Sequence, residues 1–366
     1  MADVKNVMSV DAGDIKNIMG VSTDNIKSVM SLDFPAGIPA WAGTRAIIMG
    51  GTTYTSAGAN RSINDVQYKT LATDGDTTDF DDLANAAHHA RGSGSNGTKV
   101  VKGGGMRHHA SGTVWSEDFI ESLTVATTGS VVDAGDLDIG SYNAGSSGAS
   151  NGTYCFFAGG GFAGIGTGAH IEYMNISSGW GGTDAGDIGT GTSYGHCTTN
   201  GDSKFLIMGI SSSSNTAIDT HSFSTYADSS AYGSVATIAI AYSGVVCAVN
   251  RVVTAGGYVW PNYLTRMQFF PVATNADGDS SDEADLIYGM STMGTTSDGT
   301  RGEFYGGMND DLALQLQDNS IQKVTIASLA DATDIGDLQD HAYASGSGHT
   351  YSMAGGMHSA ACQTGT

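Results

Sequence analysis

The chain has 366 residues, and its 37 acidic against 15 basic residues give a formal net charge of −22. That charge would repel a phosphate backbone, and no cluster of lysine and arginine offsets it, so nucleic acid is not an expected partner. The N-terminus has no apolar signal segment and no run of about 18 apolar residues occurs, so we expect folding in a cytoplasm and no membrane insertion.

Residues 1–34 carry an eleven-residue repeat that occurs three times and begins at Asp3, Asp14 and Asn25. Each copy starts on a residue type that caps helices and places apolar side chains at its second, fifth, sixth and eighth positions. The pattern predicts three short helices, although an eleven-residue period also fits one helix in a right-handed supercoil. Because helices of this length are not stable alone, we expect the arm to dock on a partner.

Pro35 and Pro39 mark a linker over residues 35–44, and residues 45–366 continue without a comparable break. Within this region an apolar, β-branched run ends in glycine about every 50 residues. The runs are Arg45–Gly51, Lys99–Gly105, Tyr154–Gly161, Lys204–Gly209, Arg251–Gly257, Arg301–Gly307 and Thr350–Gly356. A period of this length indicates a propeller or an array of small β units.

Each repeat contains the same further segments after its glycine run. A long strand is followed by an acidic turn such as Val132–Leu137, and a strand rich in Gly, Ala and Ser then leads to a tight turn. The tight turns are Asn96-Gly97, Asn151-Gly152, Asn200-Gly201 and Asp298-Gly299. Such dipeptides predict type I′ hairpins, in which both central residues need positive φ.

We therefore predict an all-β chain with a β-propeller over residues 45–366, preceded by the helical arm. About four antiparallel strands per repeat match one propeller blade. The seven glycine-ended runs imply about seven blades. Six blades with a surplus strand is the alternative, because only residues 357–366 follow the last run.

The glycine-ended strand within a four-stranded unit resembles the kelch, or galactose-oxidase-like, propeller. Units such as Ile326–Leu338, combined with the eleven-residue arm, are similar to tail-fibre or structural proteins in the virions of tailed phages, especially marine ones. The resemblance spans nearly the whole chain. It implies a component of a phage particle, made in the host cytoplasm, and supplies no catalytic residues.

Residue types that suit metal or catalytic chemistry are present, but their spacing favours structural roles. Carboxylates of the acidic turns can bind calcium, whereas Asx side chains more often cap their own turns. Cys155, Cys197, Cys247 and Cys362 are far apart and outside any metal-ligand spacing, so we expect buried thiols, no metal and no cofactor. No nucleophile elbow or phosphate loop occurs, and we expect no catalysis.

The loops after the glycine-ended strands differ most between repeats, from Thr52–Ser62 in the first to Met308–Asn319 in the sixth. In an antiparallel blade these loops and the blade-to-blade connections lie on one face, opposite the tight hairpins. That face is the predicted binding surface, since exposed aromatic residues suit contacts with sugars or proteins. Its candidate contact residues are Tyr54, Trp115, Tyr258, Trp260 and Tyr263. The alternative is that these rings only pack the loops down.

The expected function is that of a structural protein of a phage particle, a tail fibre or a head or tail appendage, whose residues 1–34 bind other virion proteins. The propeller is expected to bind a host surface glycan or an outer-membrane protein. Many copies on the particle, or a homo-oligomer, would compensate for weak single contacts. One alternative is a decoration protein that contacts only capsid or tail proteins, and another is a propeller enzyme that cleaves glycans.

Overall fold

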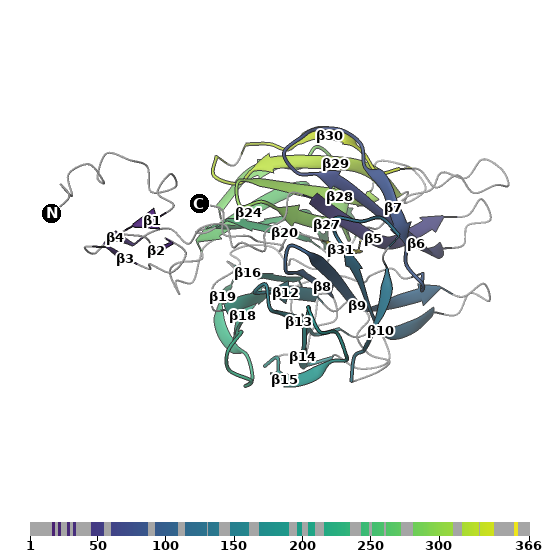
Figure 1. The fold of residues 1–366 in the computed structure, drawn as a ribbon. Coiled ribbons are helices and arrows are strands. Elements are labelled where there is room, and N and C mark those ends of the chain that lie inside the picture. Colours follow the sequence, from purple (N-terminus) through teal and green to yellow (C-terminus); the bar gives the residue numbers. More distant parts are fainter. Residues whose placement is uncertain are drawn as a thin grey trace.

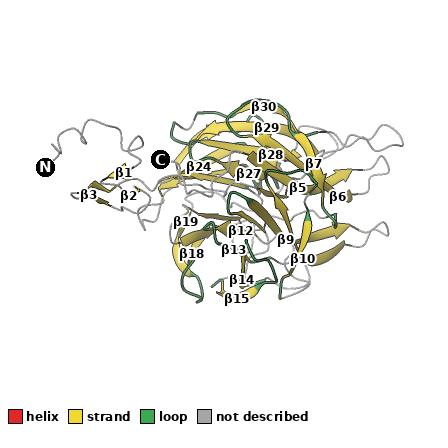
Figure 2. Cartoon of the chain, viewed as in Figure 1, coloured by secondary structure: helices red, strands yellow, loops and turns green. Residues whose placement is uncertain are grey.

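The computed structural model of the chain describes most of residues 45–357 and four short strands ahead of them. The described ranges are 17–18, 21–22, 28–29, 32–33, 45–54, 60–86, 92–108, 114–129, 131–138, 147–160, 168–189, 196–199, 204–208, 216–234, 243–248, 251–259, 261–271, 281–309, 317–328, 330–339 and 355–357. All regular structure in these ranges is β-strand, and Figure 2 shows no helix among them.

The N-terminal arm contributes two small antiparallel hairpins to the described residues. β1 (Asn17–Ile18) pairs with β2 (Val21–Ser22), and β3 (Ser28–Val29) pairs with β4 (Leu32–Asp33). The predicted helices are therefore not formed at these positions, where β-branched residues favour strand. The rest of the arm and the linker over residues 35–44 lie outside the described residues.

Six antiparallel sheets, which we call blades 1 to 6, are arranged in a ring (Figure 1). The strands of each blade are given from the inner to the outer one. Blade 1 contains β31 (Gly355–Met357), β5 (Arg45–Tyr54), β6 (Asn60–Thr70) and β7 (Thr78–Asp82), and blade 2 contains β8 (Gly92–Ser95), β9 (Lys99–His108), β10 (Val114–Thr124) and β11 (Val132–Asp136). Blade 3 contains β12 (Ser147–Ser150), β13 (Tyr154–Ala158), β14 (His170–Asn175) and β15 (Thr183–Asp187), and blade 4 contains β16 (His196–Thr199), β17 (Lys204–Met208), β18 (Ala217–Ser222) and β19 (Ser230–Ser234). Blade 5 contains β20 (Gly244–Ala248), β21 (Arg251–Ala255), β24 (Arg266–Pro271) and β25 (Ser281–Asp285), and blade 6 contains β27 (Gly294–Ser297), β28 (Arg301–Asn309), β29 (Gln317–Thr325) and β30 (Thr333–Asp337). In addition β26 (Met290–Ser291) pairs with β28, and β22 (Tyr258–Val259) pairs with β23 (Asn262–Tyr263).

The ring closes between the first and the last blade. The inner strands lie next to one another in the order β8, β12, β16, β20, β27 and β31, and β31 lies beside β8 again. β31 pairs with β5, joining Gly355 to Met49 and Met357 to Ile48. The described end of the seventh glycine-ended run, Gly355 and Gly356, thus lies in the inner strand of blade 1. The prediction of seven blades is wrong, and the alternative of six with a surplus strand is confirmed.

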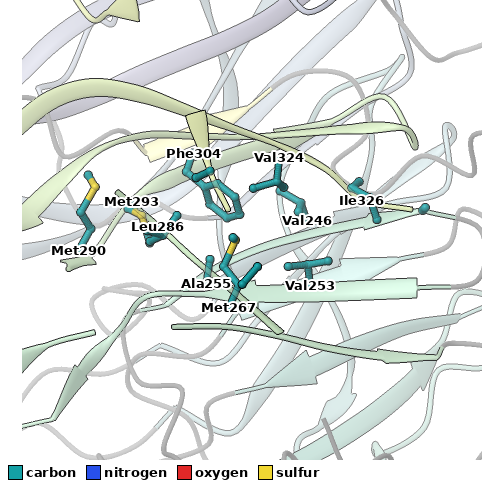
Figure 3. Packing of buried hydrophobic residues seen from close by; sticks show 13 residues of the cluster. Val246, Val253, Ala255, Met267, Leu286, Met290, Met293, Phe304, Val324 and Ile326 are labelled. Atoms are coloured by element: carbon teal, nitrogen blue, oxygen red, sulfur yellow. The ribbon is translucent and has the colours of Figure 1, made fainter. Parts of the chain in front are cut away.

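Hydrophobic side chains fill the contact between each pair of neighbouring blades. Six clusters of buried residues each combine side chains of two adjacent blades. Figure 3 shows the cluster between blades 5 and 6, where Met267 lies opposite Phe304. In β5, Ile48 packs toward blade 6 and Ile47 toward blade 2. Both faces of a blade are buried, and the second strands are therefore continuous apolar runs.

The segments predicted as acidic turns are the outer strands of the blades. Five outer strands bury only their central residue and expose both strand ends: β7, β11, β15 and β30, which carry the acidic motif, and β19, which does not. The third strand opposite carries a bulge, for example between Ile120 and Glu121. Beside it the Asp133 carboxylate accepts a hydrogen bond of 2.9 Å from the N–H of Gly135, and β15 and β30 repeat this contact. The first acid of the motif thus caps a local bend within a strand.

The described tight turns join the first and second strands of blades 2, 3 and 6, as predicted. Gly97 has φ of 81°, but Asn96 before it does not have positive φ, so the type I′ prediction is wrong. Instead Asn96 Oδ1 accepts hydrogen bonds from the N–H groups of Thr98 and Lys99 at 3.0 and 2.7 Å. An Asx cap therefore closes the turn. Asn200-Gly201 lies outside the described residues.

The double glycines interrupt the regular pairing of the second strands. β5, β9 and β28 continue past them after a bulge, whereas β13 and β21 end just before them. Both glycines have positive φ in five blades, for example 66° at Gly256 and 112° at Gly257. A Cβ on Gly256 would lie 2.3 Å from the carbonyl oxygen of Met290, in the connection between blades 5 and 6. Glycine is required here both by the backbone conformation and by the close approach of a neighbouring segment.

A buried polar side chain on the third strand links neighbouring blades. Glu172 of blade 3 accepts a hydrogen bond of 2.9 Å from the N–H of Asp138, where the chain leaves the outer strand of blade 2. The same contact joins Glu121 to Asn85, Gln322 to Ile287 and Gln67 to Gln339. Each of these buried side chains thus accepts from a backbone donor at the start of the connection that follows an outer strand.

Candidate functional site

The strand order places two kinds of connection on opposite faces of the ring. The connections from second to third strand, and those from one blade to the next, leave the sheets at one end, which we call the loop face. The tight turns and the connections from third to outer strand lie at the other end, which we call the hairpin face. The predicted separation of loops from hairpins is therefore confirmed for the described blades.

The structure brings two of the five predicted contact residues, Tyr258 and Tyr263, into direct contact with each other. Tyr54 ends β5 and Trp115 lies in β10, because these strands continue past the glycine bulge into segments predicted as loops. Trp260 lies outside the described residues. Tyr258 and Tyr263 are direct partners in the β22–β23 hairpin, with ring centroids 4.7 Å apart at an interplanar angle of 50°.

The β22–β23 hairpin is fixed to the ring by backbone hydrogen bonds. The N–H of Gly257 donates to the carbonyl of Met290 at 2.7 Å, and the N–H of Met290 donates to the carbonyl of Leu264 at 3.1 Å. The N–H of Leu264 donates to the carbonyl of Gly257 at 3.0 Å and closes the base of the hairpin. The two tyrosines are thus held against the connection from blade 5 to blade 6.

Two further apolar residues lie on that connection. Ile287 and Tyr288 are 41% and 38% exposed, although both are large and hydrophobic. A Cβ on the next residue, Gly289, would lie 2.6 Å from the carbonyl oxygen of Tyr263, so the connection passes directly against the hairpin. We call Tyr258, Tyr263, Ile287 and Tyr288 the tyrosine patch. It gathers phenol rings and an aliphatic side chain on the loop face, a composition suited to binding.

A comparison between repeats is the signal that identifies Ile287 and Tyr288 in the sequence. An apolar residue comes directly after the outer strand in each of blades 1, 2, 3, 5 and 6. The two residues that follow it are Ala-Asn, Asp-Ile, Gly-Thr and Gln-Asp in blades 1, 2, 3 and 6, but Ile-Tyr in blade 5. Two large apolar residues at a position where the other blades are mostly small or polar are not needed for ring packing.

Several basic residues make hydrogen bonds or ion pairs between neighbouring blades. Those that open the second strands donate to carbonyl oxygens of the next blade: Arg45 to Val125, Lys99 to Ser177, Arg251 to Ile326 and Arg301 to Thr73. Lys69 and Lys102 are buried beside Glu303 and Glu121. The chain has 37 acidic against 15 basic residues, and this excess of acid disfavours anionic ligands at the surface.

Several groups with shifted pKa values lie between blades and not at the tyrosine patch. Burial raises the pKa of the Cys155 thiol well above its usual range and lowers the pKa of the His221 imidazole. Burial likewise lowers the pKa of Lys69 beside Glu303 and raises the pKa of the Tyr305 phenol. Each of these groups belongs to an interface between blades, so burial in the ring accounts for the shifts.

A hollow of about 490 Å³ at the outer edge of blade 1 is lined mainly by carboxylates, from Asp65, Asp79, Asp81 and Asp82. Asp81 accepts a hydrogen bond of 3.0 Å from the N–H of Val131, and Asp65 accepts one from the Gln67 amide. Among the described residues no group of three or more His, Cys, Asp and Glu is placed to hold a metal ion. Cys155, Cys197 and Cys247 are buried thiols, as predicted.

The part of the chain described by the structure contains no helix that could cross a membrane. No protein-family model matches the sequence, and no curated protein matches it. Among solved structures, that of YjhT is similar in fold, with a TM-score of 0.58 over 78% of this chain and 97% of that chain. The two sequences are 12% identical, so the similarity shows the fold alone: a six-bladed β-propeller.

Proposed function

We propose that this chain is a structural protein of a tailed-phage particle, with residues 1–34 attached to other virion proteins and a kelch-like propeller that binds the host surface. The tyrosine patch is the observation that supports a binding role best, because it is an aromatic surface fixed to a rigid ring. The similarity of Ile326–Leu338 and of the eleven-residue arm to virion proteins supports the particle context.

A host surface glycan is the ligand that suits the patch. A tyrosine ring offers a flat apolar face beside a polar hydroxyl, which matches the C–H face and the hydroxyl groups of a sugar. The formal charge of −22 disfavours polymers rich in phosphate or sulfate. A single patch of this size binds weakly, and display of many copies on one particle raises the effective concentration.

Replacing Tyr263 and Tyr288 together by alanine is expected to weaken binding of the chain to host cells by at least about tenfold, since loss of two rings removes more than 1.4 kcal/mol. The measurement is co-sedimentation of labelled chain with cells of the infected bacterium. Tyr226→Ala is the matched control, because Tyr226 is 52% exposed and lies on the hairpin face. Undiminished binding of the double variant would show that the patch is not the contact surface.

Treatment of the cells distinguishes the two classes of receptor. Periodate oxidation of surface sugars is expected to abolish binding, whereas protease treatment leaves it intact. The opposite pattern would assign the patch to an outer-membrane protein. Release of reducing sugar by the chain would instead support a glycan-cleaving enzyme.

Removing residues 1–34 is expected to leave a folded propeller that no longer enters particles. The contacts between blades that the structure describes lie within residues 45–357, so the thermal unfolding transition should not change. Incorporation is measured by immunoblot of purified particles from cells that express the shortened chain. Normal incorporation would contradict the proposed role of the arm.

A further inference from the structure

A cleft of about 870 Å³ lies between blades 2 and 3 toward the hairpin face. Its lining comes from the outer strand β11 and from the connection that follows β14, together with Lys99 and Ser122. Trp180, on that connection, lines the cleft with a side chain that is 86% exposed. Val132 on the other side is 57% exposed. Both residues are large and apolar, yet the ring leaves them in solvent.

The backbone of Trp180 is held in place although its side chain is free. Its φ is 75°, a left-handed conformation that non-glycine residues rarely adopt. Its N–H donates to the carbonyl of Ala134 at 2.7 Å, and the N–H of Gly182 donates to the carbonyl of Asp136 at 2.8 Å. The indole is therefore carried by a segment that is fixed to the outer strand of blade 2.

The same pair of hydrogen bonds identifies the residues that correspond to Trp180 in other blades. In blade 1 the N–H groups of Gly75 and Thr77 donate to the outer strand of blade 6. In blades 4 and 6 the bond that corresponds to the one from Gly182 is donated by Ser229 and by Ala332. Trp180 lies two residues before Gly182, so its counterparts in these blades are Ala227 and Ala330. The assembly of the ring thus needs only a small residue here, and the tryptophan of blade 3 has another use.

The residue after Trp180 also differs from its counterparts. In blades 1, 4 and 6 it is aspartate, and its carboxylate accepts a hydrogen bond from a backbone N–H of the preceding outer strand: Asp76 from Asp337, Asp228 from Asp187 and Asp331 from Asp285. In blade 3 this residue is Gly181, which offers no carboxylate to the N–H of Asp136. Asp136 lines the cleft, so an oxygen atom of a ligand can occupy the place of the missing carboxylate.

The chemistry of the cleft selects an uncharged, hydroxyl-rich ligand. The flat face of the Trp180 indole suits the apolar face of a sugar ring, and Gly179 and Gly181 add no side chains beside it. Asp133 and Asp136 make the cleft unfavourable for anions. The Lys99 ammonium is bound by the carbonyl of Ser177 at 3.1 Å. We propose that this cleft binds a neutral oligosaccharide, with one sugar ring stacked on Trp180 and its hydroxyl groups bonded to the rim of β11.

This site lies on the face opposite the tyrosine patch and does not depend on a role in a particle. The test uses the full chain and trisaccharides of glucose, galactose, mannose and N-acetylglucosamine, with the indole N–H resonance of Trp180 followed by NMR. At least one of these sugars is expected to shift that resonance saturably. Trp180→Gly lacks this resonance, and titration calorimetry is expected to show that it binds at least about tenfold more weakly than the wild type. Its melting temperature should be equal or higher, because glycine accepts the positive φ.

Two control variants separate this site from the rest of the surface. Tyr226→Ala, on the next blade, and the Tyr263→Ala/Tyr288→Ala pair are both expected to leave the affinity for the trisaccharide unchanged. The proposal is overturned if none of the sugars shifts the Trp180 resonance at about 10 mM, a concentration above the Kd of even weak complexes. It is also overturned if Trp180→Gly leaves the affinity intact or abolishes a concentration-dependent dimer, which would assign the indole to self-association.

Discussion

Replacing Glu303 by alanine is expected to lower the free energy of unfolding by about 3–5 kcal/mol, the cost of leaving one member of a buried ion pair without its partner. Glu303 and Lys69 have side chains that are 0% and 2% exposed, and their charged atoms are 3.1 Å apart. Lys69 belongs to blade 1 and Glu303 to blade 6, so the pair lies at the interface that closes the ring.

Glu303 also accepts hydrogen bonds from the Arg301 guanidinium and the Tyr305 hydroxyl. Alanine at this position therefore leaves the buried Tyr305 hydroxyl without this acceptor, and leaves the Lys69 ammonium with the carbonyl oxygens of Thr70 and Thr73 but no counter-charge in Glu303. Burial already lowers the pKa of Lys69, which shows the cost of keeping its charge in the interface.

The measurement is urea unfolding of the wild type, Glu303→Ala and the double variant Lys69→Met/Glu303→Leu. The double variant removes both charges together and is expected to lie much closer to the wild type than the single variant. A loss of less than about 1 kcal/mol for Glu303→Ala, as for an exposed pair, would contradict the burial of this charge in the closing interface.

Ending the chain after residue 350 is expected to lower the free energy of unfolding by about 3–6 kcal/mol. The truncation removes β31 and exposes the inner edge of β5, where Ile48 and Met49 are 2% and 1% exposed. Burying one such side chain contributes about 1.5–3 kcal/mol. The inner strands β27 and β8 also lose the strand that lies between them.

The measurement is the melting temperature of this truncated chain, compared with that of the chain that lacks residues 1–34. The N-terminal deletion removes more residues but no strand of the ring, so its melting temperature should match that of the full chain. Equal stability of the C-terminally truncated chain would show that β31 does not close the ring.

The β-propeller and its strand boundaries follow from residues that act locally. Two successive positions with positive φ exclude most residues other than glycine, and the double glycines therefore mark where the regular pairing of a second strand bulges or stops. Asn or Asp before glycine marks the tight turns. The dipeptide does not distinguish a type I′ turn from the Asx-capped turn at Asn96, because both place a positive φ at the glycine.

The number of blades depends on a contact between the two ends of the propeller. Thr350–Gly356 has the pattern of a second strand, yet β31 is an inner strand, because the other strands of that sheet lie between residues 45 and 82. A local pattern does not show which distant segment pairs with it. The sequence therefore leaves six and seven blades open, and the pairing of β31 with β5 decides between them.

The binding surfaces are the least predictable part. The residue types of the loops identify Tyr258 and Tyr263, which the β22–β23 hairpin brings together, but Tyr288 and Trp180 stand out only when the repeats are compared with one another. Whether an apolar residue is exposed depends on how much of it the neighbouring blade covers, which a single repeat does not show. Alignment of the repeats shows instead that an apolar residue stands where the other repeats have a small or polar one. At the position of Trp180 the other blades carry small residues, such as Gly75 and Ala227.

A disulfide between β31 and β5 is the most direct test of a closed six-bladed ring. The variant carries Ile48→Cys and Met357→Cys, with Cys362→Ser to remove a competing thiol, and is oxidised while folded. Ile48 and Met357 are direct strand partners, so their Cα atoms lie within the distance that a disulfide spans. The closed ring predicts one intramolecular crosslink between these two peptides by mass spectrometry, and none in a control with Val252→Cys of blade 5 in place of Ile48→Cys. In an open or seven-bladed ring residue 357 does not pair with Ile48, and failure of this crosslink to form would contradict the six-bladed closure.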